Sequence, residues 1–118
     1  MNPTRTTALV GRLAEALARL SGATPADVPA GDGRALRVCA GAGRFVCARG
    51  GTTYGEVFIT RRPLHRVDPA TVRHELVHVR QWRRYGLGFP LLYAIAGADP
   101  LRNRFEQQAG LRDGGYLR

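Results

Sequence analysis

The sequence predicts a single α+β domain that spans residues 1–118. Two observations carry this prediction: apolar residues with helical periodicity near the N-terminus and again after residue 68, and short β-rich runs between glycine turns from residue 34 to residue 60. With 44% hydrophobic residues, the chain can form one modest core. We therefore expect an N-terminal helix, a small antiparallel β-meander, a long helix and a C-terminal helix, in that order.

The N-terminal segment, residues 4–20, has the pattern of an amphipathic helix. Its apolar positions are Leu9, Val10, Leu13, Leu17 and Leu20, and its polar positions include Arg12, Glu15 and Arg19. Charged residues within the segment argue against a signal peptide, so we expect a cytoplasmic protein, although export by another route stays open. Residues 21–33 are rich in Gly, Pro, Ala and Asp and are predicted to form a loop.

The β-meander is predicted from three runs. Residues 34–39 and 44–48 flank the turn sequence 40–43, which indicates a hairpin, and a further turn at 50–53 leads into a strand at 54–60. If the hairpin is centred on Gly43, Cys39 and Cys47 lie opposite each other and could form a disulfide in an oxidising compartment. For a cytosolic protein, two reduced cysteines are the simpler expectation.

The long helix carries the most informative motif of the chain, His74-Glu75-Leu76-Val77-His78, which reads HExxH. Asp68 is a suitable N-cap, Pro69 suits the first helical position, and no helix breaker follows before Gly86. Histidines four residues apart share one helical face and can reach one metal ion, and the glutamate between them can act on a metal-bound water. The alternative is a pair of hydrogen-bonded core histidines with a salt-bridged Glu75.

A zinc site needs a third protein ligand, and the downstream candidates are the carboxylates Asp99, Glu106 and Asp113. Glu106 is favoured because it lies beside Phe105, at the edge of the apolar face of a predicted helix that Asp99 caps. A buried carboxylate there needs a partner for its charge, and a metal ion supplies one. The alternative is a surface Glu106 that pairs with Arg102.

The motif resembles the gluzincin branch of the zincins, and residues 74–82, with Gln81 three residues after the second histidine, are similar to small bacterial zincin domains. The resemblance covers roughly residues 55–110 and implies a minimal zincin-like metalloprotease fold. It implies Zn²⁺ held by His74, His78 and Glu106, with Glu75 as the catalytic acid/base. Larger gluzincins often carry an Asp one turn after the ligand glutamate, where this chain has Ala109 and Gly110. In zincins a strand edge beside the active helix binds extended peptides, and we expect residues 56–60 to form that edge or to neighbour it.

A hydrolase of this kind also needs a donor that stabilises the developing oxyanion. Tyr85 is favoured because it shares the helical face of the histidines. The other candidates are Tyr93, Tyr116, His65 and Arg102. The apolar run 89–98 is too short to span a bilayer, so we expect a short helix packed over the long helix, or else a surface that meets a membrane or partner.

The net charge is +9, and every basic residue is Arg. The arginines are dispersed and aromatic residues do not alternate with them, so no clear nucleic-acid site emerges. We expect a zinc metallopeptidase, a hydrolase that acts on a peptide or protein substrate. The alternative function is a non-catalytic zincin-fold module that binds a partner protein or, less favoured, nucleic acid. Homo-oligomerisation stays open.

Overall fold

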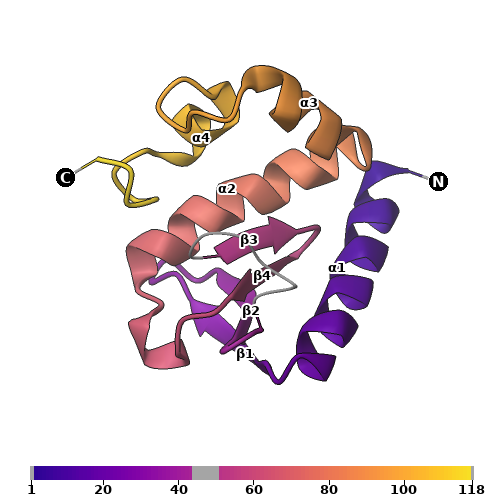
Figure 1. Ribbon diagram of the computed structural model, residues 1–118, viewed down its shortest axis with the longest axis vertical. Helices are drawn as coiled ribbons and strands as arrows, with labels where there is room; N and C mark the ends of the chain where they lie inside the picture. The colour runs from indigo at the N-terminus through magenta and orange to yellow at the C-terminus, as the bar shows by residue number, and fades with distance from the viewer. Residues whose placement is uncertain (1, 44–50, 118) are drawn as a thin grey trace.

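The computed structural model describes residues 2–43 and 51–117 and confirms the α+β class. The described strands form one mixed sheet, and helix α1 (Pro3–Leu20) stands along one side of it (Figure 1). Helix α2 (Pro69–Tyr85) crosses between this sheet and the shorter helices α3 (Gly88–Ala96) and α4 (Arg104–Ala109). Helix α2 therefore faces the sheet on one side and α4 on the other.

The described sheet has the order β1-β2-β4-β3. Strands β1 (Thr24–Pro29) and β2 (Ala35–Ala40) pair antiparallel, as do β3 (Gly51–Tyr54) and β4 (Val57–Thr60). The two halves join through a parallel β2–β4 pair, so the predicted antiparallel meander is wrong. Every residue of β4 and most of β2 are buried, which is typical of central strands covered on both faces.

Two segments predicted as irregular are strands. Residues 24–29 form β1 despite Pro25 and Pro29, because proline is tolerated in a strand at the edge of a sheet. Residues 51–53, predicted as part of a turn, belong to β3 (Gly51–Tyr54), the last strand at the other end of the described order. The predicted strand 54–60 is shorter in the structure, where β4 begins at Val57. In the described sheet β4 is a central strand beside the edge strand β3, so residues 57–60 neighbour the edge, which was one of the two expected positions.

The predicted hairpin partner of β2, residues 44–48, lies outside the described residues together with Cys47. Cys39 is buried in β2, where its backbone lies between Pro25 of β1 and Ile59 of β4. The expectation of a cross-strand cysteine pair thus concerns a segment that the structure does not describe.

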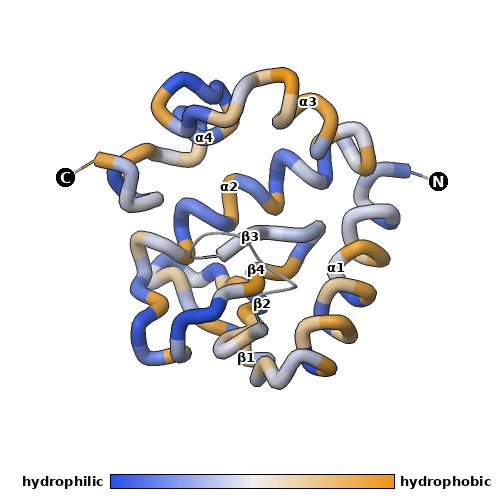
Figure 2. The backbone as a smooth tube through the Cα atoms, in the orientation of Figure 1, coloured by the Kyte–Doolittle hydropathy of each residue, from blue (hydrophilic) through white to orange (hydrophobic). Residues whose placement is uncertain are grey.

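Helix α1 forms as predicted, but it packs through small residues. Thr7, Gly11 and Ala18 are buried, and the Thr7 hydroxyl lies 2.8 Å from the carbonyl oxygen of Trp82 in α2. A methyl group on Gly55, in the β3–β4 turn, would lie 2.3 Å from the Thr7 carbonyl oxygen. Because this turn lies so close to α1, only the face with small residues can pack against it. Figure 2 shows hydrophobic positions repeating along α1. The leucines of this helix, Leu9, Leu13, Leu17 and Leu20, are all exposed.

Helix α2 begins and ends as the sequence predicts. The Asp68 side chain accepts a hydrogen bond from the Thr71 amide at 2.8 Å, Pro69 opens the helix, and Gly86 with φ 60° ends it. Val72 and Val79 belong to a buried cluster with residues of β2 and β4, whereas His74, His78 and Gln81 are buried on the side that faces α4.

The last two helices complete the layer over α2. As expected, α3 is a short helix that packs on α2, with the rings of Phe89 and Trp82 5.6 Å apart. Helix α4 begins at Arg104 with Asn103 as its cap, so the predicted start with Asp99 as the cap is wrong. The Asp99 carboxylate instead accepts from the Leu101 amide in the preceding turn. None of the helices in residues 2–43 and 51–117 is long and apolar enough to cross a membrane.

Candidate metal centre

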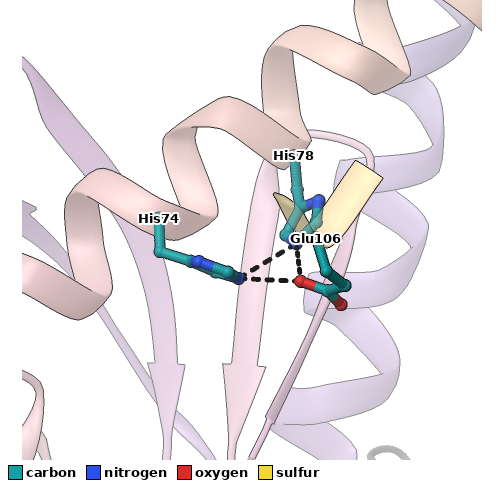
Figure 3. A group of neighbouring side chains, drawn as sticks. All are labelled: His74, His78 and Glu106. Carbon is teal, nitrogen blue, oxygen red and sulfur yellow. Dashed lines mark hydrogen bonds and ion pairs between the residues drawn. The ribbon is translucent and has the colours of Figure 1, made fainter. Parts of the chain in front are cut away.

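Three buried side chains converge between α2 and α4. Figure 3 shows His74 and His78 projecting from successive turns of α2 toward the Glu106 carboxylate from α4. Oε1 of Glu106 lies 3.0 Å from Nε2 of His74 and 2.9 Å from Nε2 of His78, and the two nitrogens are 3.1 Å apart. The structure therefore joins two residues of one motif to a carboxylate that lies 28 residues further along the chain.

The hydrogen bonds on the far side of each ring define which nitrogen carries the proton. Nδ1 of His74 lies 2.8 Å from the Gly110 carbonyl oxygen, which can only accept, so this nitrogen carries a hydrogen. Nδ1 of His78 lies 2.7 Å from Oε1 of Gln81. The Gln81 amide orientation is defined too, because its Nε2 donates to the carbonyl oxygen of Phe105 and to Oε1 of Gln108. In the neutral rings, both Nε2 atoms thus present lone pairs.

Two lone pairs and a carboxylate oxygen therefore face one another in a buried position. Such an arrangement is repulsive unless a cation lies among the three atoms, and either protons on the imidazoles or a metal ion can supply the charge. The donor set of two imidazole nitrogens and one carboxylate oxygen suits zinc, and the ligand atoms lie within 4.8 Å of one another. The residues present fit a zinc ion.

The titration behaviour of Glu106 and His78 reflects the same need for positive charge. Burial alone would raise the pKa of Glu106, but when the imidazoles are protonated on both nitrogens, their hydrogen bonds to Glu106 outweigh burial and hold that pKa well below its usual range. Burial alone would lower the pKa of His78, but its contacts with Glu106 and the charge of Glu75 raise it. The carboxylate thus stays ionised in a site that attracts a cation.

Glu75 lies beside this donor set without joining it. Its Oε1 is 4.0 Å from Nε2 of His74, and its Oε2 accepts a hydrogen bond of 2.6 Å from the Thr53 hydroxyl of β3. Burial raises the pKa of Glu75, although the nearby histidines oppose the shift. A carboxylate with a raised pKa, one oxygen anchored and the other directed toward the site, is suited to exchanging protons with a water molecule.

The competing carboxylates are engaged elsewhere. Asp99 lies 3.8 Å from Arg102 and Asp113 lies 3.6 Å from Arg73, and these are exposed pairs. The alternative in which Glu106 sits on the surface and pairs with Arg102 is therefore not what the structure contains. Among the three downstream candidates, only Glu106 is brought to the histidines within the described residues.

The candidate oxyanion donors lie at different distances from the site. Tyr85 packs against Phe105, with ring centroids 6.0 Å apart, and does not line the cavity beside Glu75. Although Tyr85 shares the helical face of His78, seven residues of helix place it about 10 Å further along the axis. Tyr93 instead donates a hydrogen bond to Oε2 of Glu106, and the Tyr116 hydroxyl lies 3.5 Å from the same oxygen. The two remaining candidates, His65 and Arg102, are exposed.

Several supporting residues escaped the sequence analysis. The carbonyl of Gly110 orients His74. A side-chain motif cannot predict this contact, because every residue has a backbone carbonyl. Gly114 packs flat against the same ring, and a methyl group there would lie 2.4 Å from Cε1 of His74. For Gln81 a signal existed: its position three residues after His78 places the two side chains on one helical face. Thr53 carried no signal, since it lies in a strand predicted as a turn.

A cavity of about 560 Å³ opens beside the three converging side chains. Its polar lining residues include Thr53, Glu75, His78 and Glu106. Much of the rest of the lining comes from apolar residues of α2, α3 and the turn after α3, namely Trp82, Phe89, Pro90, Ala94, Gly97 and Ala98. All four residues of β3 also line the cavity, so the edge strand of the described sheet runs along one wall.

Comparison of the chain with protein-family models, curated proteins and solved structures found no match. The resemblance to gluzincins therefore rests on the motif residues and the later glutamate alone. The chemistry of the site follows from its own geometry: an N,N,O donor set, a buried carboxylate beside it, and a cavity that reaches both.

Proposed function

We propose that this protein is a zinc-dependent peptidase with a minimal zincin-like fold. The observation that carries the proposal is the convergence of two imidazole lone pairs and the Glu106 carboxylate beside a cavity that Glu75 also lines. Structural zinc sites are normally closed by four protein ligands, whereas catalytic sites have three protein ligands and an open position. Three donors beside a cavity match the catalytic type.

His74, His78 and Glu106 would hold the zinc ion, with Gly110 and Gln81 keeping both imidazoles in the required tautomer. Zinc bound there would supply acidification of a water molecule and polarisation of a substrate carbonyl. The protein's own part in proton transfer belongs to Glu75. Its Oε1, directed toward the site, would accept the proton of the attacking water while Thr53 holds Oε2 in place, and the raised pKa would let the same group return that proton to the leaving amine.

The walls of the cavity favour a peptide as the substrate. The edge strand β3 presents backbone groups along one wall, and an extended peptide can pair with such an edge by strand addition. The apolar lining residues, among them Trp82, Phe89 and Ala94, suit an apolar side chain of the substrate. Tyr93 and Tyr116 place hydroxyl groups beside the site and are, with Tyr85, the candidates for the oxyanion donor.

The proposal is tested by separating metal binding from turnover. Zinc content is measured by mass spectrometry on the wild type, Glu75→Gln, Glu106→Ala and a control, Glu56→Gln, whose carboxylate pairs with Arg83 away from the cavity. A mixed peptide library is then digested and read by mass spectrometry. We expect near-stoichiometric zinc in the wild type, Glu75→Gln and Glu56→Gln, a sharp loss in Glu106→Ala, and cleavage only by the wild type and the control.

Two results would overturn the proposal in different ways. Absence of zinc from the wild type, even after reconstitution, removes the metal centre. Stoichiometric zinc without cleavage of any peptide favours the alternative, a zincin-fold module that binds a partner protein, because Glu75 would then have no substrate to act on.

A further inference from the structure

The outer side of α1 carries an exposed row of leucines. Leu9, Leu13, Leu17 and Leu20, together called the Leu stripe here, are 45%, 59%, 59% and 85% exposed. Spacings of four, four and three residues place them on one helical face. Single exposed leucines are ordinary on a protein surface, but a continuous row along an 18-residue helix marks an interaction surface.

Packing of the opposite face fixes α1 with the Leu stripe pointing outward. The opposite face holds Thr7, Gly11 and Ala18, which are buried against the rest of the domain. A methyl group on Gly11 would lie 3.1 Å from the backbone nitrogen of Glu56, so the helix approaches the β3–β4 turn as closely as glycine allows. Turning α1 to bury the Leu stripe would force leucine side chains into this contact. The exposed row therefore belongs to the folded state.

Arginines run along one border of the Leu stripe. Arg5, Arg12 and Arg19 are spaced by seven residues and are all exposed, and they fall within an arc of about 40° that begins about 40° from Leu9. Glu15, the single acidic residue of the helix, is turned toward Arg37 of β2, with 2.7 Å between Oε1 and Nε. The outer side of α1 thus combines apolar side chains with positive charge.

We propose that α1 docks on an anionic lipid surface. The Leu stripe would enter the boundary between headgroups and acyl chains, and the three arginines would contact lipid phosphates. The Leu stripe could be covered by a membrane or by a second copy of the chain, and the net charge favours the membrane. The net charge of +9 on each molecule opposes self-association and favours a negative surface. This docking does not depend on the metal centre.

The test uses flotation of the full chain with two kinds of vesicle, phosphatidylcholine alone and phosphatidylcholine mixed with phosphatidylglycerol. We expect binding to the mixed vesicles only, and a marked loss of binding at high salt. Leu13→Ser/Leu17→Ser is expected to weaken binding at least tenfold. The matched control is Leu87→Ser/Leu91→Ser near α3, where the leucines are 67% and 65% exposed, and it should bind like the wild type. Circular dichroism checks that both variants are folded.

Three outcomes would overturn the proposal: no binding to the mixed vesicles, binding that only the α3 control loses, and binding equal on neutral and anionic vesicles. A fourth measurement addresses the other occupant. If light scattering shows a concentration-dependent dimer that Leu13→Ser/Leu17→Ser abolishes, the Leu stripe is an interface between copies of this chain.

Discussion

The carbonyl oxygen of Gly110 accepts a hydrogen bond from Nδ1 of His74 at 2.8 Å, and this contact leaves the opposite nitrogen free to bind a cation. Gly110 also ends α4, the helix that carries Glu106. One turn of chain thus positions two of the three converging groups. Residues that never touch a metal ion can therefore control its affinity.

Substitution of Gly114 tests how firmly His74 is positioned. In Gly114→Ala the added methyl group would lie 2.4 Å from Cε1 of His74, so the ring or the 111–117 turn must shift. We expect zinc affinity to fall about 10- to 100-fold, the usual effect of losing the support of a ligand. Competition with a chromophoric chelator measures it. Gly88→Ala is the control, because a methyl group there meets no atom within 4 Å. Equal affinities in the two variants would contradict the prediction.

Gln81→Leu removes the acceptor that orients His78. The ring then loses its 2.7 Å contact and can adopt the other tautomer, so zinc affinity should fall by a similar factor of about 10 to 100. The same chelator competition applies. Gln107→Leu provides a matched control on the exposed side of α4, where the Gln107 amide donates to the Leu101 carbonyl. Unchanged affinity in Gln81→Leu would show that the hydrogen bond is dispensable.

The aromatic hydroxyls make a prediction about turnover. If Tyr93 or Tyr116 stabilises the developing oxyanion, replacing that residue by Phe should lower kcat of the zinc-saturated protein by roughly 100-fold. Tyr85→Phe should leave kcat unchanged, because Tyr85 does not line the cavity. Steady-state kinetics on a peptide found in the library digest separates the three variants. A large loss in Tyr85→Phe alone would restore the expectation drawn from the sequence.

The cap of α2 makes a prediction about acid stability. The hydrogen bond from the Thr71 amide, opposed by partial burial, lowers the pKa of Asp68 from 3.8. A carboxyl group whose pKa is lower in the folded state than in the unfolded state stabilises the fold at pH values above its unfolded-state pKa. This stability is lost as the pH falls through its folded-state pKa. Asp68→Ala should therefore lower the free energy of unfolding by about 1 kcal/mol near pH 7, and by less as the pH falls below 3.8.

Urea unfolding of the zinc-free protein at several pH values measures this effect. Asp68→Asn serves as the matched variant, since it keeps an acceptor for the Thr71 amide without a titrating group. Its deficit relative to the wild type should be smaller near pH 7. A deficit in Asp68→Ala that stays constant down to low pH would show that the carboxylate charge contributes nothing.

Local signals explain what the sequence predicted well. The cap at Asp68, the motif in α2 and the polar position of Glu106 beside Phe105 depend on neighbours within one or two helical turns, and each is found where expected. The sheet order depended on contacts between distant segments. The sequences of β2 and β4 do not predict their parallel pairing, because the apolar sequences of buried central strands resemble one another.

Three further features lay beyond the sequence reasoning, each for a distinct physical reason. Tyr85 was favoured because a helical wheel records angle but not rise along the axis. The Gly110 carbonyl could not be foreseen, since backbone groups have no sequence signature. For α1, the wheel correctly separated leucines from polar residues, but the close approach of Gly55 made the small-residue face the buried one.

The meeting of His74, His78 and Glu106 also bears on how this chain balances stability against function. The arrangement brings like electron pairs together among buried side chains, so without a positive charge between them it costs stability rather than adding to it. Replacing His78 by an apolar residue of similar volume would relieve this conflict. Selection for stability alone would disfavour such a trio, so its presence agrees with the metal-binding role proposed above.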